Sequence, residues 1–404
     1  MTAQVSNNPG VPLEGLRVLE VGHYIAGPHC TQILSDWGAR VVKLERPTGD
    51  PGRASGTQIN GNGLYFAVQN RGKESLAMDL KSAGGRDAIR RLIRWADVVV
   101  SNYSPAALEK LDLAYPTLRE LNPAVILIQA SGFGSAGEFR DWVAFDSVIQ
   151  AMSGLVDMTG QPDGPPTIPG YFIADHLAGI YSALAAMGAI IERYRTGEGQ
   201  CIDVSMLDCL VSIGAYPQAI SHVPGGHLTR RGNLPGHSAP IAVYPALDGY
   251  VSVCAMTDKM WRKVTEVMGL ADLAADRSLD TRVGRRAARE RIDGAIIQWT
   301  SSRTRQEIAS LLQASGVAAG PVNAVGELEA DPRVAARMST TQLECQDGTI
   351  IAGAGPAVMT EGMKAGLEAA SHRARIPGLG EHSAEILSEL GYDSEQISSI
   401  LAGN

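Results

Sequence analysis

The sequence predicts an α/β protein whose larger part is built on a parallel sheet. Apolar strands and helices alternate from Val18 to Met206, and the strands are continuous apolar runs, as is typical of strands buried on both faces. Beyond a glycine-rich stretch at residues 222–237 the pattern changes to that of a smaller α+β part. The chain has 404 residues, 45% of them apolar and 19% charged, so we expect a folded protein with two domains.

The first βαβ unit is the clearest part of this pattern. Residues 18–21 and 41–45 are apolar runs that predict two strands, and residues 29–39 predict the helix between them. The loop Gly22–Pro28 joins the first strand to this helix. Such a unit is typical of the layered folds that bind nucleotides.

The alternation continues along the chain. Helices are expected at Gly84–Trp95, from Pro105 and at Phe145–Met158. Strands are expected at Asp97–Asn102, Ala124–Ser131 and Cys201–Met206. A Pro- and Gly-rich loop, Gly160–Gly170, precedes the uncharged stretch Leu177–Ile191. This stretch is shorter than the roughly 20 apolar residues of a membrane-spanning helix, so we expect a helix buried in the core.

The second part has a different pattern. Residues 241–256 predict a hairpin with Asp248 and Gly249 at its turn. Amphipathic helices are expected after it, at Asp258–Met268, Arg285–Thr300 and Arg305–Ser315. Two short strands near Thr340–Ala352 and two terminal helices complete the expected elements.

Charge and cysteine content exclude several classes of function. The net charge of −8 argues against a nucleic-acid partner, because phosphate binding needs clustered Lys and Arg. Five cysteines without a CxxC pair predict neither a disulfide framework nor a zinc site, and the histidines lack metal-binding spacing. Residues 1–12 lack the cationic start and apolar run of a secretory signal. We therefore expect a cytoplasmic protein without a bound metal.

A literal GxGxxG occurs at Gly132, Gly134 and Gly137, directly after an expected strand. A dinucleotide fingerprint stands in the first βα turn and opens a helix at its last glycine. Here the motif is late in the chain, and residues 138–142 intervene before the next helix. A nicotinamide oxidoreductase is therefore only a minor alternative.

Asp175 and His176 stand at the start of the apolar helix, directly after the Pro- and Gly-rich loop. In the simpler interpretation, Asp175 caps free N–H groups of the helix and suits its dipole. In the other, its carboxylate is held beside apolar surface and acts as a nucleophile toward a carbonyl. The pattern alone leaves both interpretations open.

The segment Ile173–Asp208, IADHLAGIYSALAAMGAIIERYRTGEGQCIDVSMLD, resembles the signature of the family III CoA-transferases, which include carnitine and bile-acid CoA-transferases. Further segments are similar to other blocks of this family in the same order: Gly15–Arg53, Arg71–Ser82, Ala96–Leu111, Ala144–Leu155, Arg230–Val253, Gly316–Pro332 and Gly378–Tyr392. The resemblance covers almost the whole chain.

This resemblance implies a fold and an assembly. It implies a large Rossmann-like CoA-binding domain over residues 1–222, then a linker and a small α+β domain over residues 223–325. Residues 326–404 are then expected to return to the large domain. In this family a ring-like chain interlocks with a second copy, so we expect a homodimer.

The resemblance also implies the chemistry, an acyl-CoA:carboxylate CoA transfer. Asp175 matches the nucleophile, which forms first an anhydride with the acyl group and then a thioester with CoA. Asp146 matches an acidic position that orients the acyl or thiolate group, with a helix N-cap as the alternative. CoA is a substrate rather than a bound cofactor. Its expected contacts are His23, Ile25, Ala26, Arg46, Lys73, Asn102, Tyr103 and Lys110, with the three cations meeting phosphates.

Two departures from the family pattern bear on the substrate. Ile25 stands where the formyl-CoA transferase branch has a glutamine, and Gly225–Asn233 replaces the tetraglycine loop of that branch. Both disfavour oxalate and formate, and Ile25 suits a larger or less polar acyl group.

Alternative functions remain beside the transferase. An α-methylacyl-CoA racemase needs a histidine before its aspartate, where this chain has Ala144-Phe145-Asp146. A non-catalytic CoA-binding protein is disfavoured by the intact Asp175.

Overall fold

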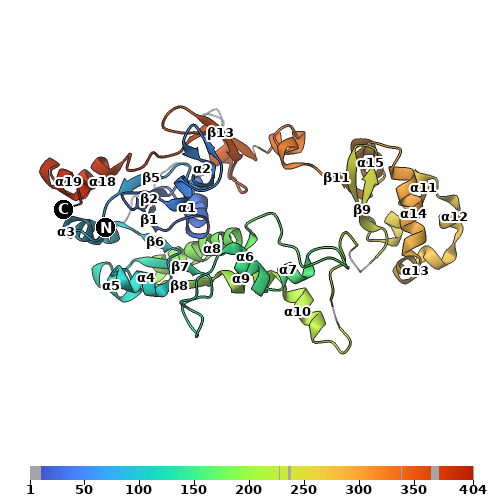
Figure 1. Ribbon diagram of the computed structural model, residues 1–404, viewed down its shortest axis with the longest axis horizontal. Coiled ribbons are helices and arrows are strands. Elements are labelled where there is room, and N and C mark those ends of the chain that lie inside the picture. The colour runs from blue at the N-terminus through green and yellow to red at the C-terminus, as the bar shows by residue number, and fades with distance from the viewer. Residues whose placement is uncertain (1–10, 227, 235–237, 338, 365–372, 404) are drawn as a thin grey trace. The chain divides into compact units, whose positions relative to one another are not determined.

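The computed structural model of the chain describes residues 11–226, 228–234, 238–337, 339–364 and 373–403 (Figure 1). It divides into two compact units. The larger unit consists of described residues within 1–155, 168–219 and 332–404, and the smaller of those within 156–167 and 220–331. Part of the expected linker, residues 227 and 235–237, lies outside the described residues.

The larger unit is built on a six-stranded sheet with the order β5-β2-β1-β6-β7-β8. Every neighbouring pair is parallel, and Leu19 of β1 pairs with Val42 of β2 on one side and Val99 of β6 on the other. The strands are β1 (Arg17–Val21), β2 (Arg40–Glu45), β5 (Glu74–Ala77), β6 (Val98–Ser101), β7 (Ile126–Ser131) and β8 (Cys201–Ser205). The predicted α/β class and parallel sheet are confirmed.

Both faces of the sheet are covered, because alternate strand residues point to opposite sides. Val18 and Val41 pack on one face, and their neighbours Leu19 and Val42 pack on the other. The first face is covered mainly by α1 (Ala26–Asp36), α8 (Ile173–Thr196) and α9 (Met206–Ile213). The second is covered by α3 (Ala83–Trp95), α5 (Tyr115–Leu121), α18 (Ser383–Glu389) and α19 (Ser394–Leu401). Figure 1 shows α18 and α19 beside α3, so the end of the chain packs on the larger unit.

The central helix α8 has 24 residues and packs against α1 through small residues. A Cβ at Gly179 would lie 2.9 Å from the Cβ of His29, so only glycine permits this approach of the two helices. By length and hydropathy alone α8 is a candidate membrane span. Its buried residues, among them Ala178, Ala183 and Ala186, belong to the core of the larger unit, as expected of a core helix.

Several boundaries differ from the expected ones. Helix α1 begins at Ala26 rather than His29, because Pro28 stands in its first turn, where no N–H needs an intrahelical acceptor. The helix expected over 145–158 is two, α6 (Asp146–Met152) and α7 (Leu155–Met158), separated by Gly154 at φ 86°. Strand β5 and helix α5 were not expected at all.

Shorter elements complete the larger unit and the segment between the units. They are β3 (Gln58–Ile59), β4 (Asn62–Gly63), α2 (Leu64–Ala67), α4 (Pro105–Lys110), α10 (Ala215–Ser221), α16 (Pro332–Ala335), β12 (Thr340–Glu344), β13 (Ile350–Ala354) and β14 (Arg373–Arg375). The sheet β13-β12-β14 packs beside α2, around Phe66, Leu343 and Ile376.

The smaller unit combines a three-stranded antiparallel sheet with helices. The sheet order is β11-β10-β9, and the pairing of Gly249 with Ala246 leaves Leu247 and Asp248 as the hairpin turn. Trp261 is buried in its core. The elements are β9 (Ile241–Ala246), β10 (Gly249–Cys254), α11 (Asp258–Met268), α12 (Ala271–Ala275), α13 (Arg282–Ala287), α14 (Arg289–Thr300), α15 (Arg305–Ala314) and β11 (Ala318–Pro321).

Candidate active site

The candidate site lies where the strand order of the parallel sheet reverses. From β1 the chain proceeds to β2 and β5 on one side, whereas β6, β7 and β8 follow on the other. Loops that leave the carboxyl ends of β1 and β6 therefore diverge, and open α/β sheets bind ligands at such a point. His23 follows β1, and Asn102 and Tyr103 follow β6. The topology thus brings three of the expected CoA contacts to one place.

Asn102 links the two loops through its side-chain amide. The His23 N–H donates to Asn102 Oδ1 at 3.0 Å, and Asn102 Nδ2 donates to the His23 carbonyl at 2.8 Å. The rings of His23 and Tyr103 lie 5.2 Å apart. A Cβ at Gly22 would lie 2.7 Å from Asn102 Oδ1, so a glycine is required beside this amide. The β1–α1 loop is therefore fixed against β6.

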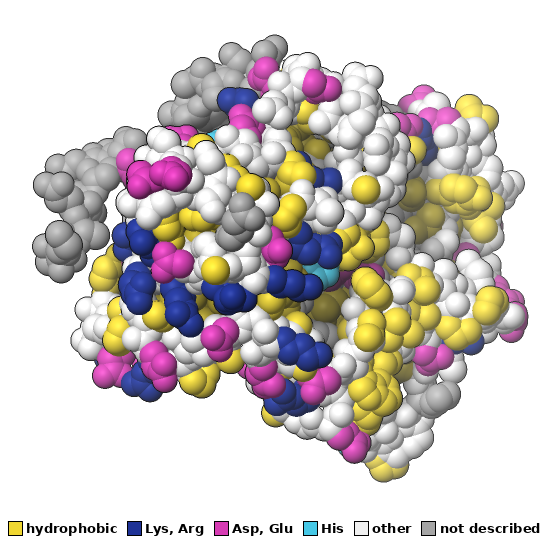
Figure 2. Space-filling view, turned by 60° about the vertical axis from the view of Figure 1, so that its left-hand side comes forward, with side chains coloured by type: hydrophobic (Ala, Val, Ile, Leu, Met, Phe, Trp, Pro, Cys, Tyr) yellow, Lys and Arg dark blue, Asp and Glu magenta, His cyan; other side chains and the backbone are white. Residues whose placement is uncertain are grey.

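The remaining expected CoA contacts differ in their accessibility. Ile25 and Ala26 are buried at the start of α1. Arg46, after β2, and Lys110, at the end of α4, are exposed and free to meet phosphates. Figure 2 shows Lys and Arg side chains gathered in one region of the surface, despite the net charge of −8.

Lys73 does not occupy the position expected of a phosphate ligand. Its side chain has no exposed surface, and Nζ donates to Glu20 Oε2, Pro28 O and Asn70 Oδ1 at 2.8 to 2.9 Å. An ammonium group has three protons, and all three are used. Lys73 therefore binds protein oxygens beneath the β1–α1 loop rather than a ligand.

Asp175 is half-buried in the first turn of α8. Its carboxylate accepts no hydrogen bond and forms no ion pair within the described ranges of the chain. Burial, together with the nearby Asp146 carboxylate, raises the pKa of Asp175 to about 7. The simpler interpretation, a helix cap, therefore does not account for this side chain. An unpaired carboxylate with a raised pKa is typical of a functional group.

Asp146 supplies the cap that α8 lacks. The N-cap residue of α8 is Phe172, which has no side-chain acceptor. Asp146 Oδ1 accepts from the Ala174 N–H at 2.8 Å and from the Asp175 N–H at 3.3 Å. The buried Gln150 donates to Asp146 Oδ2 and, at 3.0 Å, to the Tyr171 carbonyl. Asp146 begins α6, yet the helix that it caps is α8.

Aromatic side chains connect the two carboxylates to the β1–α1 loop. The ring of Tyr65 lies 5.5 Å from Phe172 and 6.0 Å from Tyr24. Phe145, which precedes Asp146, lies 6.3 Å from Tyr24. Burial and the negative charges of Asp175 and Asp146 raise the pKa of Tyr65 to about 12. The expected nucleophile and the expected CoA loop therefore belong to one site.

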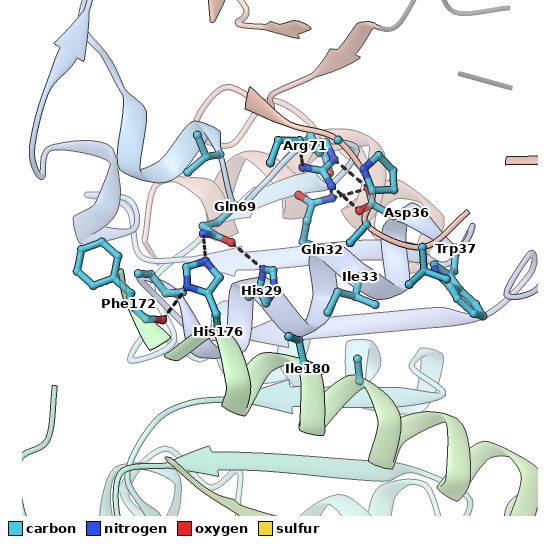
Figure 3. Close-up of a pocket in the computed structure, with 18 of the residues that line it drawn as sticks. His29, Gln32, Ile33, Asp36, Trp37, Gln69, Arg71, Phe172, His176 and Ile180 are labelled. Carbon is cyan, nitrogen blue, oxygen red and sulfur yellow. Dashed lines mark hydrogen bonds and ion pairs between the residues drawn. The ribbon is translucent and has the colours of Figure 1, made fainter. Parts of the chain in front are cut away.

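A cavity of about 710 Å³ adjoins this aromatic wall (Figure 3). Ile25, Tyr65 and Phe172 line the end that is shared with the site, and the cavity continues between α1, α8 and residues 354–358. Gln69 bridges two histidines in its wall: Oε1 lies 3.2 Å from His29 Nδ1, and Nε2 lies 3.1 Å from His176 Nε2. Burial, followed by the charge of His176, lowers the pKa of His29 to about 4, so this ring is neutral near pH 7.

The GxGxxG motif does not lie where a dinucleotide fingerprint would. No helix opens at Gly137, since α6 begins at Asp146, and Gly134 instead approaches the Asp203 side chain. Across the described part of the chain, no group of three or more His, Cys, Asp or Glu side chains could hold a metal ion.

Sequence reasoning missed several residues of the site. Gln150, four residues after Asp146 on α6, is the one that helical spacing could have suggested. Tyr24, Asp50 and Tyr65 carry no motif and come together only through the fold.

Comparisons with known proteins show which proteins this chain resembles as a whole. A family model described as CoA-transferase family III matches residues 13–383. Succinate–glutarate CoA-transferase of Agrobacterium fabrum is 35% identical over 398 residues, which cover 96% of this chain and 98% of that protein. Succinyl-CoA:mesaconate CoA-transferase of Haloarcula hispanica is 37% identical, covering 94% of this chain and 96% of that one. The crystal structure of a CAIB/BAIF family protein from Brucella suis, 34% identical, superposes with a TM-score of 0.81 and covers 94% of this chain and 100% of that one.

Proposed function

Because the chain belongs to the family III CoA-transferases, as its sequence blocks predicted, we propose that it moves CoA from an acyl-CoA thioester to a carboxylic acid through Asp175. It is an enzyme of the acyl-CoA:carboxylate CoA-transferase class. The observation that carries the proposed role of Asp175 is its unpaired carboxylate, in the first turn of α8 that Phe172 and Tyr65 connect to the β1–α1 loop.

In the first half of the reaction, the Asp175 carboxylate attacks the thioester carbonyl carbon. The C–S bond breaks, CoA leaves as the thiolate, and a mixed anhydride of Asp175 and the acyl group remains. The thiolate then attacks the Asp175 carbonyl carbon of this anhydride. The donor acid leaves as its carboxylate, and Asp175 carries CoA as a thioester.

In the second half, the carboxylate of the acceptor attacks the Asp175 thioester and releases the CoA thiolate. The resulting anhydride is attacked by the thiolate at the acceptor's acyl carbon, which gives the new acyl-CoA and restores the Asp175 carboxylate. Each step exchanges one activated acyl bond for another, so no ATP is needed. Backbone N–H groups of the glycine-rich loops would stabilise the tetrahedral oxyanions.

We propose succinyl-CoA as donor and a dicarboxylic acid as acceptor. The relatives named for succinate and glutarate, and for succinyl-CoA and mesaconate, support this choice. Arg46 and Lys110 are the exposed cations suited to the CoA phosphates. CoA acts as a substrate here, and a cytoplasmic location stays a prediction.

A donor-by-acceptor panel tests this function. Succinyl-CoA is incubated with glutarate, mesaconate or a monocarboxylic acid, and new thioesters are identified by mass. Hydroxylamine added with succinyl-CoA is expected to leave a hydroxamate on the peptide that contains Asp175. A peptide without this mass change, in a sample that transfers CoA, would contradict the covalent mechanism. Solvent deuterium at Cα of a 2-methylacyl-CoA, without CoA exchange, would instead support a racemase.

The pH dependence follows from the raised pKa of Asp175. A carboxylate attacks only when ionised, so kcat/KM for succinyl-CoA is expected to fall as the pH drops below about 7. Well below pH 7, kcat/KM is expected to fall about tenfold for each pH unit. Thermal melting over the same range serves as the control for folding. Constant kcat/KM between pH 5 and pH 8 would refute a nucleophile with this pKa.

We further propose a homodimer. The α8 side chains Ile180, Leu184, Ile191 and Tyr194 are 47%, 60%, 62% and 75% exposed, which is unusual for large apolar residues along one helix. A second copy of the chain would bury them.

Leu184→Arg is expected to convert a dimer to a monomer in light scattering after size exclusion, whereas Leu401→Arg on α19 is expected to leave the dimer unchanged. A wild-type monomer at micromolar concentration would contradict the proposal.

A further inference from the structure

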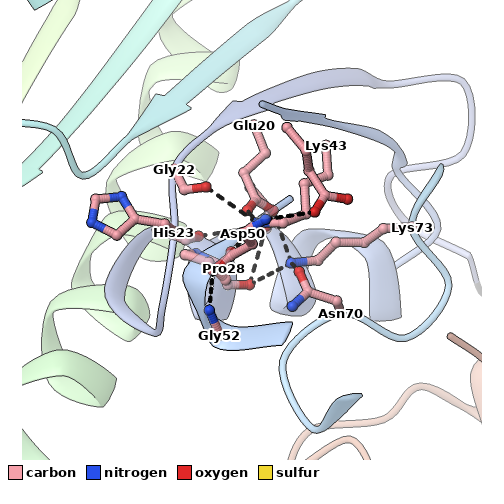
Figure 4. A network of polar contacts seen from close by, with 12 residues as sticks. Glu20, Gly22, His23, Pro28, Lys43, Asp50, Gly52, Asn70 and Lys73 are labelled. Atoms are coloured by element: carbon pink, nitrogen blue, oxygen red, sulfur yellow. Dashed lines mark hydrogen bonds and ion pairs between the residues drawn. The ribbon is translucent and has the colours of Figure 1, made fainter. Parts of the chain in front are cut away.

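Four charged side chains are buried together beneath the β1–α1 loop (Figure 4). They are two carboxylates and two ammonium groups: Glu20, Asp50, Lys43 and Lys73. Lys43 Nζ lies 2.5 Å from Glu20 Oε1 and 2.8 Å from Asp50 Oδ2, and their side chains are at most 2% exposed. Buried ion pairs are weak evidence of net stability, because desolvation offsets most of their attraction. The cluster therefore calls for a further explanation.

The cluster contacts the start and the middle of the loop between β1 and α1, and the first turn of α1 that follows it. Lys43 Nζ donates to the Gly22 carbonyl at 3.2 Å, and Lys73 Nζ donates to the Pro28 carbonyl at 2.8 Å. Asp50 Oδ1 accepts from the Tyr24 N–H at 3.3 Å. Because Lys43 holds the other oxygen of Asp50, this carboxylate is fixed in the orientation that receives the loop.

Tyr24 has a backbone conformation that needs such support. Its φ is 61°, in the left-handed region, which a residue with a Cβ rarely adopts. Strained residues of this kind persist where the surroundings determine them, and they concentrate at functional sites. Tyr24 stands between His23 and Ile25, and its ring lies 5.0 Å from His23 and 6.0 Å from Tyr65. The turn at Tyr24 thus sets the backbone direction at His23 and Ile25.

We propose that Asp50 is a positioning residue: with Lys43 it holds Tyr24 in the left-handed turn and thereby preforms the loop that binds CoA. The inference rests on the proposed function in one respect, that the β1–α1 loop is a CoA contact. Asp50 does not touch the reacting atoms. Its effect is expected on CoA affinity and on KM, with kcat changed much less.

A double-mutant cycle between Asp50 and Tyr24 tests the proposal. Asp50→Ala is expected to raise the Kd of CoA, measured by titration calorimetry, and the KM of succinyl-CoA by about tenfold or more. Tyr24→Gly permits the left-handed turn without strain, so Asp50→Ala should change the Kd less than threefold in that background. Asp50→Asn, which keeps the shape, is expected to give an intermediate Kd and guards against loss of folding in Asp50→Ala.

The control variant is Asp97→Ala. Asp97 pairs with Arg17 and Arg193 and accepts from the Arg17 N–H, so it has similar contacts at the amino-terminal ends of β1 and β6, away from the site. It is expected to lower the melting temperature and leave the Kd of CoA unchanged. An unchanged Kd in folded Asp50→Asn and Asp50→Ala, or equal losses in both Tyr24 backgrounds, would overturn the proposal. Failure of the proposed function looks different, since wild-type protein would then bind CoA without transferring it.

Discussion

Replacing Asp175 with alanine or asparagine is expected to lower kcat for CoA transfer by at least about 10³-fold, because in the proposed mechanism this residue forms all three covalent intermediates. Asparagine keeps the size of the side chain but cannot form an anhydride with the acyl group. The measurement is the rate of new thioester formation from succinyl-CoA and glutarate. CoA affinity should stay within a few-fold of wild type, because the proposed CoA contacts His23 and Asn102 lie on other loops.

Asp208→Asn is the matched control for this variant. Asp208 also stands in the first turn of a helix of the larger unit, α9, and is exposed. Like Asp175, Asp208 places a negative charge at the start of a helix, which contributes about 0.5 kcal/mol to stability through the helix dipole. No part in the proposed reaction is assigned to Asp208. A comparable loss of kcat in both variants would indicate damage to folding rather than loss of a nucleophile.

Stability should change in the opposite direction to activity. The folded-state pKa of Asp175, about 7, lies above its ordinary value of 3.8, so the folded protein binds this proton more tightly than the unfolded chain. Stability is therefore lost as the pH rises from about 4 to 7, when the folded state must ionise a half-buried group. Asp175→Asn removes that cost and is expected to raise the melting temperature more at pH 8 than at pH 5.

Removing the carboxylate of Glu20 is expected to have the largest effect on folding. Glu20→Ala leaves Lys43 paired with Asp50 but removes the carboxylate with which the buried Lys73 ammonium group pairs. Breaking a buried ion pair in this way costs about 3–5 kcal/mol. That is a large part of the 5–15 kcal/mol that typically stabilises a domain, so denaturant unfolding should show a strong decrease.

The contrast is Glu74→Gln, which breaks an ion pair at the surface. Glu74 pairs with Arg40 at 2.9 Å, but its side chain is 27% exposed. Its loss should cost at most about 1 kcal/mol. Equal destabilisation by the two variants would show that Glu20 is not the centre of a buried network.

The same network has a characteristic pH range. Burial alone would raise the pKa of Glu20, but the charges of Lys43 and Lys73 outweigh it and lower this pKa to about 2. Because this pKa is lower in the folded state, Glu20 contributes stability at pH values above its unfolded pKa of about 4.5. That contribution is lost as the pH falls through 2.

The sequence predicted the sheet and its main helices because continuous apolar strands carry a strong signal. The short strand β5, Glu74–Ala77, was missed because its sequence, ESLA, is not a continuous apolar run, unlike the equally short β6, VVVS. Contacts with β2 and with the C-terminal segment hold this strand in place. The Gly380 N–H donates to Ser75 Oγ at 2.9 Å, and Ser75 Oγ donates to Glu45 of β2 at 2.6 Å. Contacts over such separations leave no local pattern.

The enzyme class could be predicted from the sequence, whereas the residues that support the candidate site could not. The expected grouping of His23, Asn102 and Tyr103 agrees with the topology of β1 and β6. Lys73 is the instructive failure, because a lysine in a family block looks the same in a sequence whether it binds a phosphate or a buried carboxylate. Burial separates the two cases, and burial depends on β1, β2 and the loop above them.

The capping of α8 by Asp146 has a consequence for motion. Helix ends fray because their first N–H groups lack partners, and such local opening costs little free energy. Asp146 occupies the Ala174 and Asp175 N–H groups, and Gln150 ties Asp146 to the Tyr171 carbonyl. The first turn of α8 is thereby closed against unwinding. In the proposed mechanism, two anhydrides and a thioester form in turn on the Asp175 carboxyl group. The backbone of Asp175 can then stay in place while only its side chain turns.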